Sequence, residues 1–308
     1  MRIAPLVVLA LALGCGEYVA YDGDGAGVAV RAPGAGDLDD ATRARYAALT
    51  RLDHLGLEAL LGRFVQQTPG QTRVDYAALA GQDEALLLLD QYLAQLDAVD
   101  PMGLESDAER VAYWFNAYNA AVVRGVLTFW EGDPGWSVSE EAFLFFDQPI
   151  WSFGGVVLSL NQVEHGVIRG DASHASVRSL DADGQATIAR LHAGLWGGGE
   201  PDPRLHVALN CASLSCPDLA GTTPRAFRAD TLEAQLSTLT AAFLANPTKG
   251  AGPAGVSSLF LWYRADFSRG GYTGVQDFIA RGRADGLDGV ATDRTLPYDW
   301  TLNNATGP

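Results

Sequence analysis

One segment of the chain, residues 111–123, contains no charged side chain, although 19% of the protein is Asp, Glu, Lys or Arg. The sequence Ser-Asp-Ala-Glu at residues 106–109 is a capping box, so a helix should begin at Asp107. A helix that is apolar on every side has to be buried. Asn116 and Asn119 lie one turn apart within it, and each amide needs a specific partner because an unpaired buried amide costs about 1–3 kcal/mol.

Apolar periodicity predicts that most of the remaining chain is also helical. The predicted helices cover residues 38–66 in one or two segments, residues 83–99, residues 186–195, a segment capped by Asp230 and Glu233, and residues 274–280. Strand patterns are fewer: a hairpin over residues 149–160 with Gly154-Gly155 as its turn, and strands over residues 205–209 and 256–263. We therefore expect an α+β fold, a mostly helical single domain around a small central β-sheet with a β-hairpin.

The start of the chain indicates export. An apolar run over residues 3–13 is shorter than the about 20 apolar residues that cross a bilayer, which indicates a signal peptide. The residues that end it, Ala-Leu-Gly-Cys, resemble a bacterial lipobox, so we expect residues 1–15 to be a lipoprotein-type signal peptide and Cys15 to be lipidated. The alternative is a plain secretory signal or a simple membrane anchor. Residues 16–37 should form a Gly-rich flexible tether, and residues 38–308 the globular domain. These features predict a protein of the bacterial cell envelope, anchored to a membrane surface on its periplasmic or extracellular side through Cys15 only.

The net charge and the absence of certain motifs argue against several classes of function. The formal net charge is −16, which argues against nucleic acid as a partner because neutralising phosphates requires clustered Lys and Arg. The sequence contains no Gly-x-Ser-x-Gly elbow and no phosphate-binding loop, so serine hydrolase and nucleotide chemistry are not expected. No close-spaced ligand pair beyond C-x4-C suggests zinc, and we predict neither a metal site nor a cofactor.

The chemistry of the chain depends on two cysteines, Cys211 and Cys216, which follow the predicted strand over residues 205–209. A strand that ends in Asn-Cys and opens into a loop can present a reactive thiol from a rigid scaffold. The same two cysteines can instead form a disulfide, which is the default state in an exported protein and adds about 2 kcal/mol on the loop-entropy model. Both interpretations remain open on the sequence.

If Cys211 is a nucleophile, it needs a base and a group that orients the base. His206 should lie about 16 Å up the strand at about 3.3 Å per residue, on the opposite face. His165 is therefore the predicted base, with Asn116 or Asp299 as the residue that orients it. The backbone amides of Ala212 and Ser213 are the expected oxyanion donors.

Around this site we expect a network of buried or binding polar groups. Asn161 and Glu164 should form the N-cap and its N3 partner at the start of a short helix that carries His165. Arg169 or Arg204 is expected beside Glu164. The predicted network consists of Asn119, Asn161, Glu164, Arg169, Arg204 and Asn210.

Five ordered segments resemble the family catalogued as domain of unknown function 547. They are Tyr-Trp-Phe-Asn-Ala-Tyr-Asn at 113–119, Leu-Ser-Leu-Asn-Gln-Val-Glu-His-Gly-Val-Ile-Arg at 158–169, residues 202–217 with Asn-Cys and Ser-Cys-Pro, Trp-Tyr and Asp-Phe within 262–267, and Tyr-Asp-Trp-Thr-Leu-Asn at 298–303. The resemblance covers residues 74–303. It implies that the Asn pair, the Glu-His pair, the Asn-Cys step and the Tyr-Asp-Trp tail belong to one constellation, and it implies no particular activity.

These patterns lead to two functional hypotheses. The first is an envelope lipoprotein that acts as a thiol-dependent hydrolase or transferase on amide or peptide bonds, with a small-molecule or peptide ligand. The alternative is a non-catalytic binding or structural module of the envelope, held together by a Cys211–Cys216 disulfide.

Overall fold

The computed structural model describes residues 17–21, 27–31 and 38–305. The predicted signal peptide and Cys15 lie outside the described residues, as does most of the predicted tether. Within the tether, strands β1 (Glu17–Tyr21) and β2 (Gly27–Arg31) pair antiparallel. None of the helices in the described ranges is long and apolar enough to cross a bilayer.

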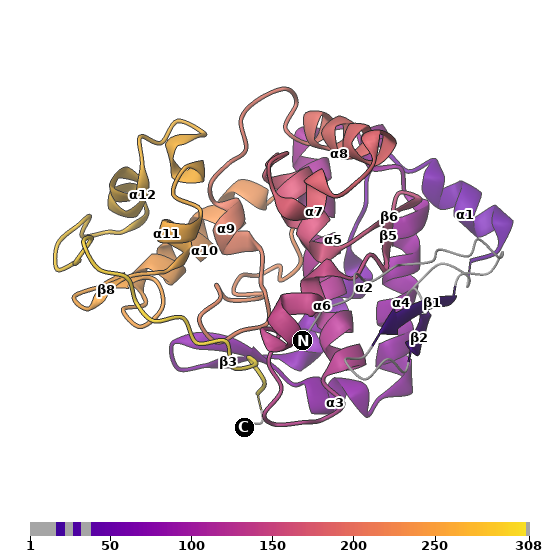
Figure 1. Ribbon diagram of the computed structural model, residues 1–308, viewed down its shortest axis with the longest axis horizontal. Coiled ribbons are helices and arrows are strands. Elements are labelled where there is room, and N and C mark those ends of the chain that lie inside the picture. Colours follow the sequence, from indigo (N-terminus) through magenta and orange to yellow (C-terminus); the bar gives the residue numbers. More distant parts are fainter. Residues whose placement is uncertain (1–16, 22–26, 32–37, 306–308) are drawn as a thin grey trace, which may run out of the picture.

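The centre of the fold is helix α5 (Asp107–Phe129), which runs through the middle of the molecule (Figure 1). Its N-cap is Ser106, whose side-chain oxygen accepts a hydrogen bond from the backbone N–H of Glu109 at 3.1 Å. Every residue from 111 to 123 is buried. The capping box therefore predicted the start of this helix correctly, and the charge-free segment predicted its burial.

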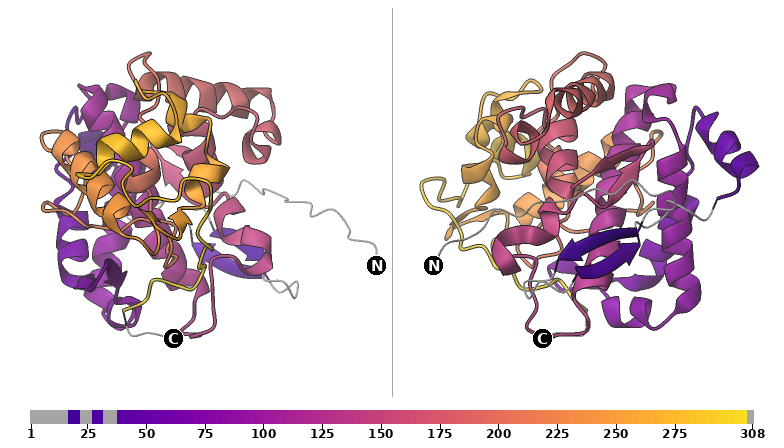
Figure 2. Two further views of the ribbon diagram at one scale, coloured as in Figure 1. Left: turned by 90° about the vertical axis from the view of Figure 1, so that its left-hand side faces the viewer. Right: turned by 45° about the vertical axis from the view of Figure 1, so that its right-hand side comes forward.

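Other helices surround α5. Helices α4 and α8 pack directly against it, and α2 packs against α4. The last third of the chain forms a second group of helices around α10 on the opposite side (Figures 1 and 2). The helices have these bounds: α1 Asp40–Ala47, α2 Leu55–Phe64, α3 Tyr76–Ala80, α4 Asp83–Ala98, α6 Leu144–Asp147, α7 Ala175–Arg178, α8 Ala182–Leu195, α9 Leu205–Ala208, α10 Leu232–Ala245, α11 Leu259–Trp262 and α12 Val275–Gly282.

The single turns and the strands are short. The η elements are the 3₁₀ turns η1 (Pro101–Gly103), η2 (Glu140–Phe143) and η4 (Asp266–Ser268), and the π-helix η3 (Gln162–Ile168). Beside β1–β2, the described strands form three antiparallel pairs: β3 (Val65–Thr68) with β4 (Gln71–Val74), β5 (Trp151–Phe153) with β6 (Val156–Leu158), and β7 (Ala251–Gly252) with β8 (Gly255–Val256). The mostly helical α+β single domain is thus confirmed. Its strands form separate two-stranded pairs in place of one central sheet.

Two predicted strands are wrong. Residues 205–208 form a helical turn, α9, and the predicted strand over 256–263 is β8 followed by α11. In the first case every residue from Leu205 to Leu209 is buried, so the alternation of large apolar residues does not separate a core face from a solvent face. Periodicity cannot distinguish a strand from a helical turn when both faces are covered.

The C-terminal segment docks on the domain. Isolated β-bridges join Thr301 to Ser137, Leu302 to Ser213 and Asn304 to Val74. The segment therefore connects the loop between Cys211 and Cys216 with the N-terminal half of the domain, and it brings the hydroxyl of Tyr298 to within 3.3 Å of the Cys211 sulfur.

The hairpin turn allows a matched test of the fold. Gly154 and Gly155 both have positive φ, at 59° and 75°. An added Cβ at Gly154 would lie 2.5 Å from Cδ of Pro101, whereas nothing lies within 4 Å of one at Gly155. Gly155→Ala should lower the free energy of unfolding by about 1–2 kcal/mol through backbone strain alone, and Gly154→Ala by about 1–3 kcal/mol more because a rigid ring is in the way. Urea unfolding followed by circular dichroism measures both, and equal losses would contradict this packing.

Candidate functional site

A cavity of about 380 Å³ brings together residues that lie far apart in the sequence. Side chains of α5, η3, α9, α11, the cysteine loop and the C-terminal segment line it. Of the predicted site residues, the cavity is lined by Asn161, Glu164, His165, Cys211 and Cys216. It is also lined by two further histidines, His174 and His206, and by Tyr298.

Cys211 presents a half-buried thiol to this cavity. Its Sγ lies 3.2 Å from Oγ of Ser213 and 3.3 Å from the hydroxyl of Tyr298. Burial acts to raise the pKa of this thiol, but hydrogen bonds from Cys216, Ser213 and Tyr298 outweigh burial and lower the pKa to about 7. Cys211 therefore has the thiolate character that a nucleophile requires near neutral pH.

Cys216 has the opposite environment. It is buried, and its Sγ accepts a hydrogen bond from the backbone N–H of Cys211 at 2.8 Å. Burial raises the pKa of Cys216 well above its ordinary value. Both thiols are free in the structure, and the disulfide remains a prediction that thiol titration tests.

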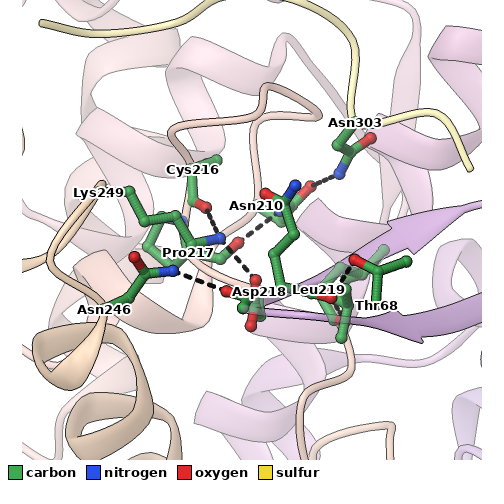
Figure 3. A network of polar contacts seen from close by, with 12 residues as sticks. Thr68, Asn210, Cys216, Pro217, Asp218, Leu219, Asn246, Lys249 and Asn303 are labelled. Atoms are coloured by element: carbon green, nitrogen blue, oxygen red, sulfur yellow. Dashed lines mark hydrogen bonds and ion pairs between the residues drawn. The ribbon is translucent and has the colours of Figure 1, made fainter. Parts of the chain in front are cut away.

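A network of hydrogen bonds and an ion pair fixes the conformation of the cysteine loop (Figure 3). Nδ2 of Asn210 donates to the carbonyl of Pro217 at 2.6 Å, and its Oδ1 accepts from the backbone N–H of Ala212 at 2.9 Å. The buried Lys249 donates to the carbonyl of Cys216 at 2.9 Å and pairs with Asp218 at 2.6 Å. These contacts close the loop on itself and fix the two cysteines relative to each other.

Helix α5 supports the same loop through its two asparagines. Asn119 donates to the carbonyl of Ala208 and accepts from the N–H of Asn210, both at 2.9 Å. Asn116 bonds in the same way to the N–H and carbonyl of Phe227, at 2.9 and 2.8 Å. Asn116 thus lies away from the cavity and does not orient His165, whereas Asn119 acts as the predicted structural tie.

The hydrogen bonds of His165 determine which of its nitrogens carries a proton. Nη1 of Arg169 lies 2.5 Å from Nδ1 of His165. Arginine only donates, so Nδ1 must accept and the neutral ring carries its proton on Nε2. Burial of the imidazole lowers the pKa of His165 to about 4. His165 is therefore neutral at pH 7 and donates from Nε2, which does not suit the predicted role of proton acceptor.

His174 has the same tautomer. Its ring stacks on that of His165 at a centroid distance of 3.7 Å. The backbone N–H of Ser176 donates to Nδ1 of His174 at 3.3 Å, which again places the proton of the neutral ring on Nε2.

His206 has the opposite tautomer. Its Nε2 lies 2.9 Å from Oδ2 of the buried Asp266. Hydrogen bonds from His206 and Arg169 hold the pKa of Asp266 far below its usual range, although burial opposes them, so this carboxylate only accepts. Burial lowers the pKa of His206, which is thus neutral with its proton on Nε2. Nδ1 makes no hydrogen bond with any residue that the structure describes, and its lone pair remains available as a base.

The sequence interpretation missed His206 because of the wrong strand. A strand places His206 about 16 Å from Cys211, but the helical turn α9 shortens this segment and puts both side chains on one cavity. The Asp-Phe pair at residues 266–267 was noticed only through the family resemblance. No pattern in the sequence assigned Asp266 to a histidine.

Glu164 is fixed by two tyrosines and not by a helix cap. The hydroxyl of Tyr118 donates to its Oε2 at 2.9 Å, and that of Tyr263 to its Oε1 at 3.0 Å. Burial acts to raise the pKa of Glu164, but His165, His206 and Arg169 together lower it. The predicted cap partner, Asn161, instead donates to Asp147 at 2.7 Å.

The other predicted residues lie elsewhere. The side chain of Asp299 accepts from the backbone N–H of Thr301 and is exposed, so it does not reach the histidines. Arg204 pairs with Asp202 and Glu233 outside the cavity. The N–H of Ala212 is engaged by Asn210, and that of Ser213 bonds the Cys211 thiol, so neither is a free oxyanion donor. No cluster of three or more metal-ligating side chains is present in the part of the chain that the structure describes.

The unequal acidities of the two thiols lead to a direct prediction. Site-resolved alkylation of the reduced, folded protein with iodoacetamide should modify Cys211 with a rate that rises through about pH 7, since its thiolate forms there. Cys216 should react at least about tenfold more slowly up to pH 9, because burial keeps it protonated. Peptide mass spectrometry separates the two sites. Faster modification of Cys216, or an inflection for Cys211 above pH 9, would contradict the assigned environments.

Comparison with known proteins supports only part of the resemblance seen in the sequence. The family described as "Protein of unknown function, DUF547" matches residues 102–244, which include α5, His165, His206 and both cysteines of the loop. No curated protein and no solved structure matches the chain. Asp266 and Tyr298 lie beyond the matched residues. The chain therefore carries a domain that matches this family of unknown function.

Proposed function

We propose that this protein is a thiol-dependent hydrolase or transferase that acts on amide or peptide bonds. The observation that carries the proposal is that the thiol of Cys211, with a pKa lowered to about 7, shares one cavity with a histidine oriented by a buried carboxylate. A nucleophile, a base and a group that orients the base are the three parts that acyl transfer through cysteine needs. The proposal includes the export and lipid anchoring at Cys15 that the start of the sequence predicts.

In the proposed mechanism, Cys211 attacks the carbonyl carbon of the substrate and forms a carbon–sulfur bond. Nδ1 of His206 accepts the thiol proton and then transfers it to the leaving amine as the carbon–nitrogen bond breaks. Asp266 holds the ring with Nε2 protonated and stabilises the imidazolium form. The carbon–sulfur bond of the resulting thioester is then cleaved by water in a hydrolase or by an amine in a transferase, which frees the acyl product and the Cys211 thiol.

His165 has a different role in this proposal from the one that the sequence predicted. Its Nε2 donates and makes no hydrogen bond among the described residues, so it is suited to stabilise negative charge on the substrate oxygen. The hydroxyl of Tyr298, which lies 3.3 Å from the Cys211 sulfur, is a second donor at the reacting atom.

The alternative function is a binding or structural module in which Cys211 and Cys216 form a disulfide. One observation favours it: the Cys216 sulfur lies 2.8 Å from the Cys211 amide nitrogen, so the two thiols are adjacent. In an exported protein such a pair is readily oxidised. Oxidation would remove the nucleophile and leave the cavity as a binding site.

Acylation by an activated ester distinguishes the two functions. The reduced protein should react with p-nitrophenyl acetate in a burst of about one equivalent, with the acetyl group on Cys211. His206→Asn should slow the burst at pH 7 by about 10²–10⁴-fold, because a positioned base contributes that factor. The control, His192→Asn, alters a histidine outside the cavity that bonds the carbonyl of Val167, and it should change the rate by less than about threefold.

Three results would count against the proposal. They are the absence of acetylation at Cys211 in the reduced protein, an equal loss in the His192→Asn control, and an unchanged burst in His206→Asn. If thiols become reactive only after unfolding and reduction, the disulfide-bonded module is correct instead.

A further inference from the structure

The outer wall of the cavity is a group of aromatic side chains that remains accessible. Trp262 is 46% exposed and Phe143 is 36% exposed, which is high for large apolar residues. The rings of Trp262 and Trp300 are stacked 5.8 Å apart at 14°, and those of Phe143 and Trp300 lie 4.8 Å apart. Tyr298, the partner of Cys211, contacts both tryptophan rings. An aromatic wall therefore extends from the nucleophile to the surface, and we call Phe143, Trp262 and Trp300 the aromatic rim.

The charges of the same cavity have one sign. Asp147 and Glu164 line it, and none of its lining residues is Lys or Arg. Asp147 ends helix α6, which directly follows Phe143, so one short segment supplies both a ring and a carboxylate. Its carboxylate accepts a hydrogen bond from Asn161 and forms no ion pair with any described residue.

Two buried cations near this cavity already have carboxylate partners. Lys249, which bonds the carbonyl of Cys216, pairs with Asp218 at 2.6 Å. The guanidinium of Arg169 lies 4.6 Å from the ring centre of Tyr263, is buried, and pairs with Asp266 at 2.7 Å. It therefore lies at the histidine end of the cavity, and Asp147 has no ion-pair partner among the residues that the structure describes. The chain as a whole carries a formal charge of −16, which adds to the negative potential at the mouth.

The faces of aromatic rings attract cations, by about 0.5–1 kcal/mol at exposed sites and about 2 kcal/mol where water is excluded. A carboxylate beside such rings adds a direct charge pair. We propose that the aromatic rim and Asp147 form a subsite for a cationic side chain, an ammonium or a guanidinium, of the peptide substrate. The subsite rests on the proposed function only in its relation to Cys211; its preference for a cation follows from the rim and Asp147.

A binding measurement separates the subsite from the catalytic proposal. The full chain with Cys211→Ala, which cannot form a thioester, is titrated calorimetrically with Nα-acetyl-arginine amide and with Nα-acetyl-citrulline amide. The two ligands have nearly the same shape, and only the first is charged. The arginine derivative should bind at least about tenfold more tightly.

Variants at the mouth assign the preference to its residues. Asp147→Asn should reduce binding of the arginine ligand to that of citrulline, whereas Asp293→Asn, an exposed aspartate that lines a different cavity, makes the same charge change and should leave the ratio unaltered. Trp262→Leu should weaken binding of the arginine ligand by more than about threefold. This second variant tests the subsite if the Asp147 variant does not fold.

The subsite would be refuted by equal binding of the two ligands, by tighter binding of Nα-acetyl-glutamate amide, or by an equal effect of Asp293→Asn. Because the binding measurement involves no turnover, a failure to detect acyl transfer would not change its conclusion about the cationic subsite. Conversely, an active enzyme that binds citrulline as well as arginine would retain the proposed function and lose the cationic subsite.

Discussion

The structure depends on one pair of hydrogen bonds between the buried helix and the cysteine loop. Asn119 of α5 takes the place of a neighbouring backbone by bonding the carbonyl of Ala208 and the N–H of Asn210. The residue before Cys211 is thereby fixed to the most deeply buried helix of the fold. Each group of such a pair costs about 1–3 kcal/mol if it is left unpaired in the interior. The packing of α5 in the core consequently also determines where the thiol of Cys211 lies.

A second constraint assigns the histidines their roles. Asp266 accepts from both Arg169 and His206, at 2.7 and 2.9 Å. The same arginine donates to His165. In the proposed mechanism, this buried ion pair therefore leaves Nδ1 of His206 as a proton acceptor and Nε2 of His165 as a donor. In this account the cavity contains a base and a hydrogen-bond donor with opposite tautomers, and the arrangement follows from the fixed donor character of arginine and the ionised carboxylate.

The sequence predicted what depends on local patterns. The charge-free segment of α5, its capping box and the Gly154-Gly155 hairpin follow from patterns over a few residues, and the structure contains them. The helical turn α9 could not be predicted, because both of its faces are buried and alternation loses its meaning there. That one error excluded His206 and promoted His165. The pairing of Asp266 with His206 joins residues far apart in the chain, and only the tertiary fold determines it.

We propose that His206, and not His165, offers an unprotonated nitrogen in the cavity that Cys211 lines. Nitrogen-15 NMR of the histidine rings in the reduced protein at pH 7 measures this directly, with His165→Gln and His206→Gln used to assign the signals. We expect that His206 is protonated at Nε2 and bare at Nδ1, and that His165 is protonated at Nε2 with Nδ1 in a strong hydrogen bond. A His206 ring that carries its proton on Nδ1, or a His165 ring with Nε2 bare, would contradict it.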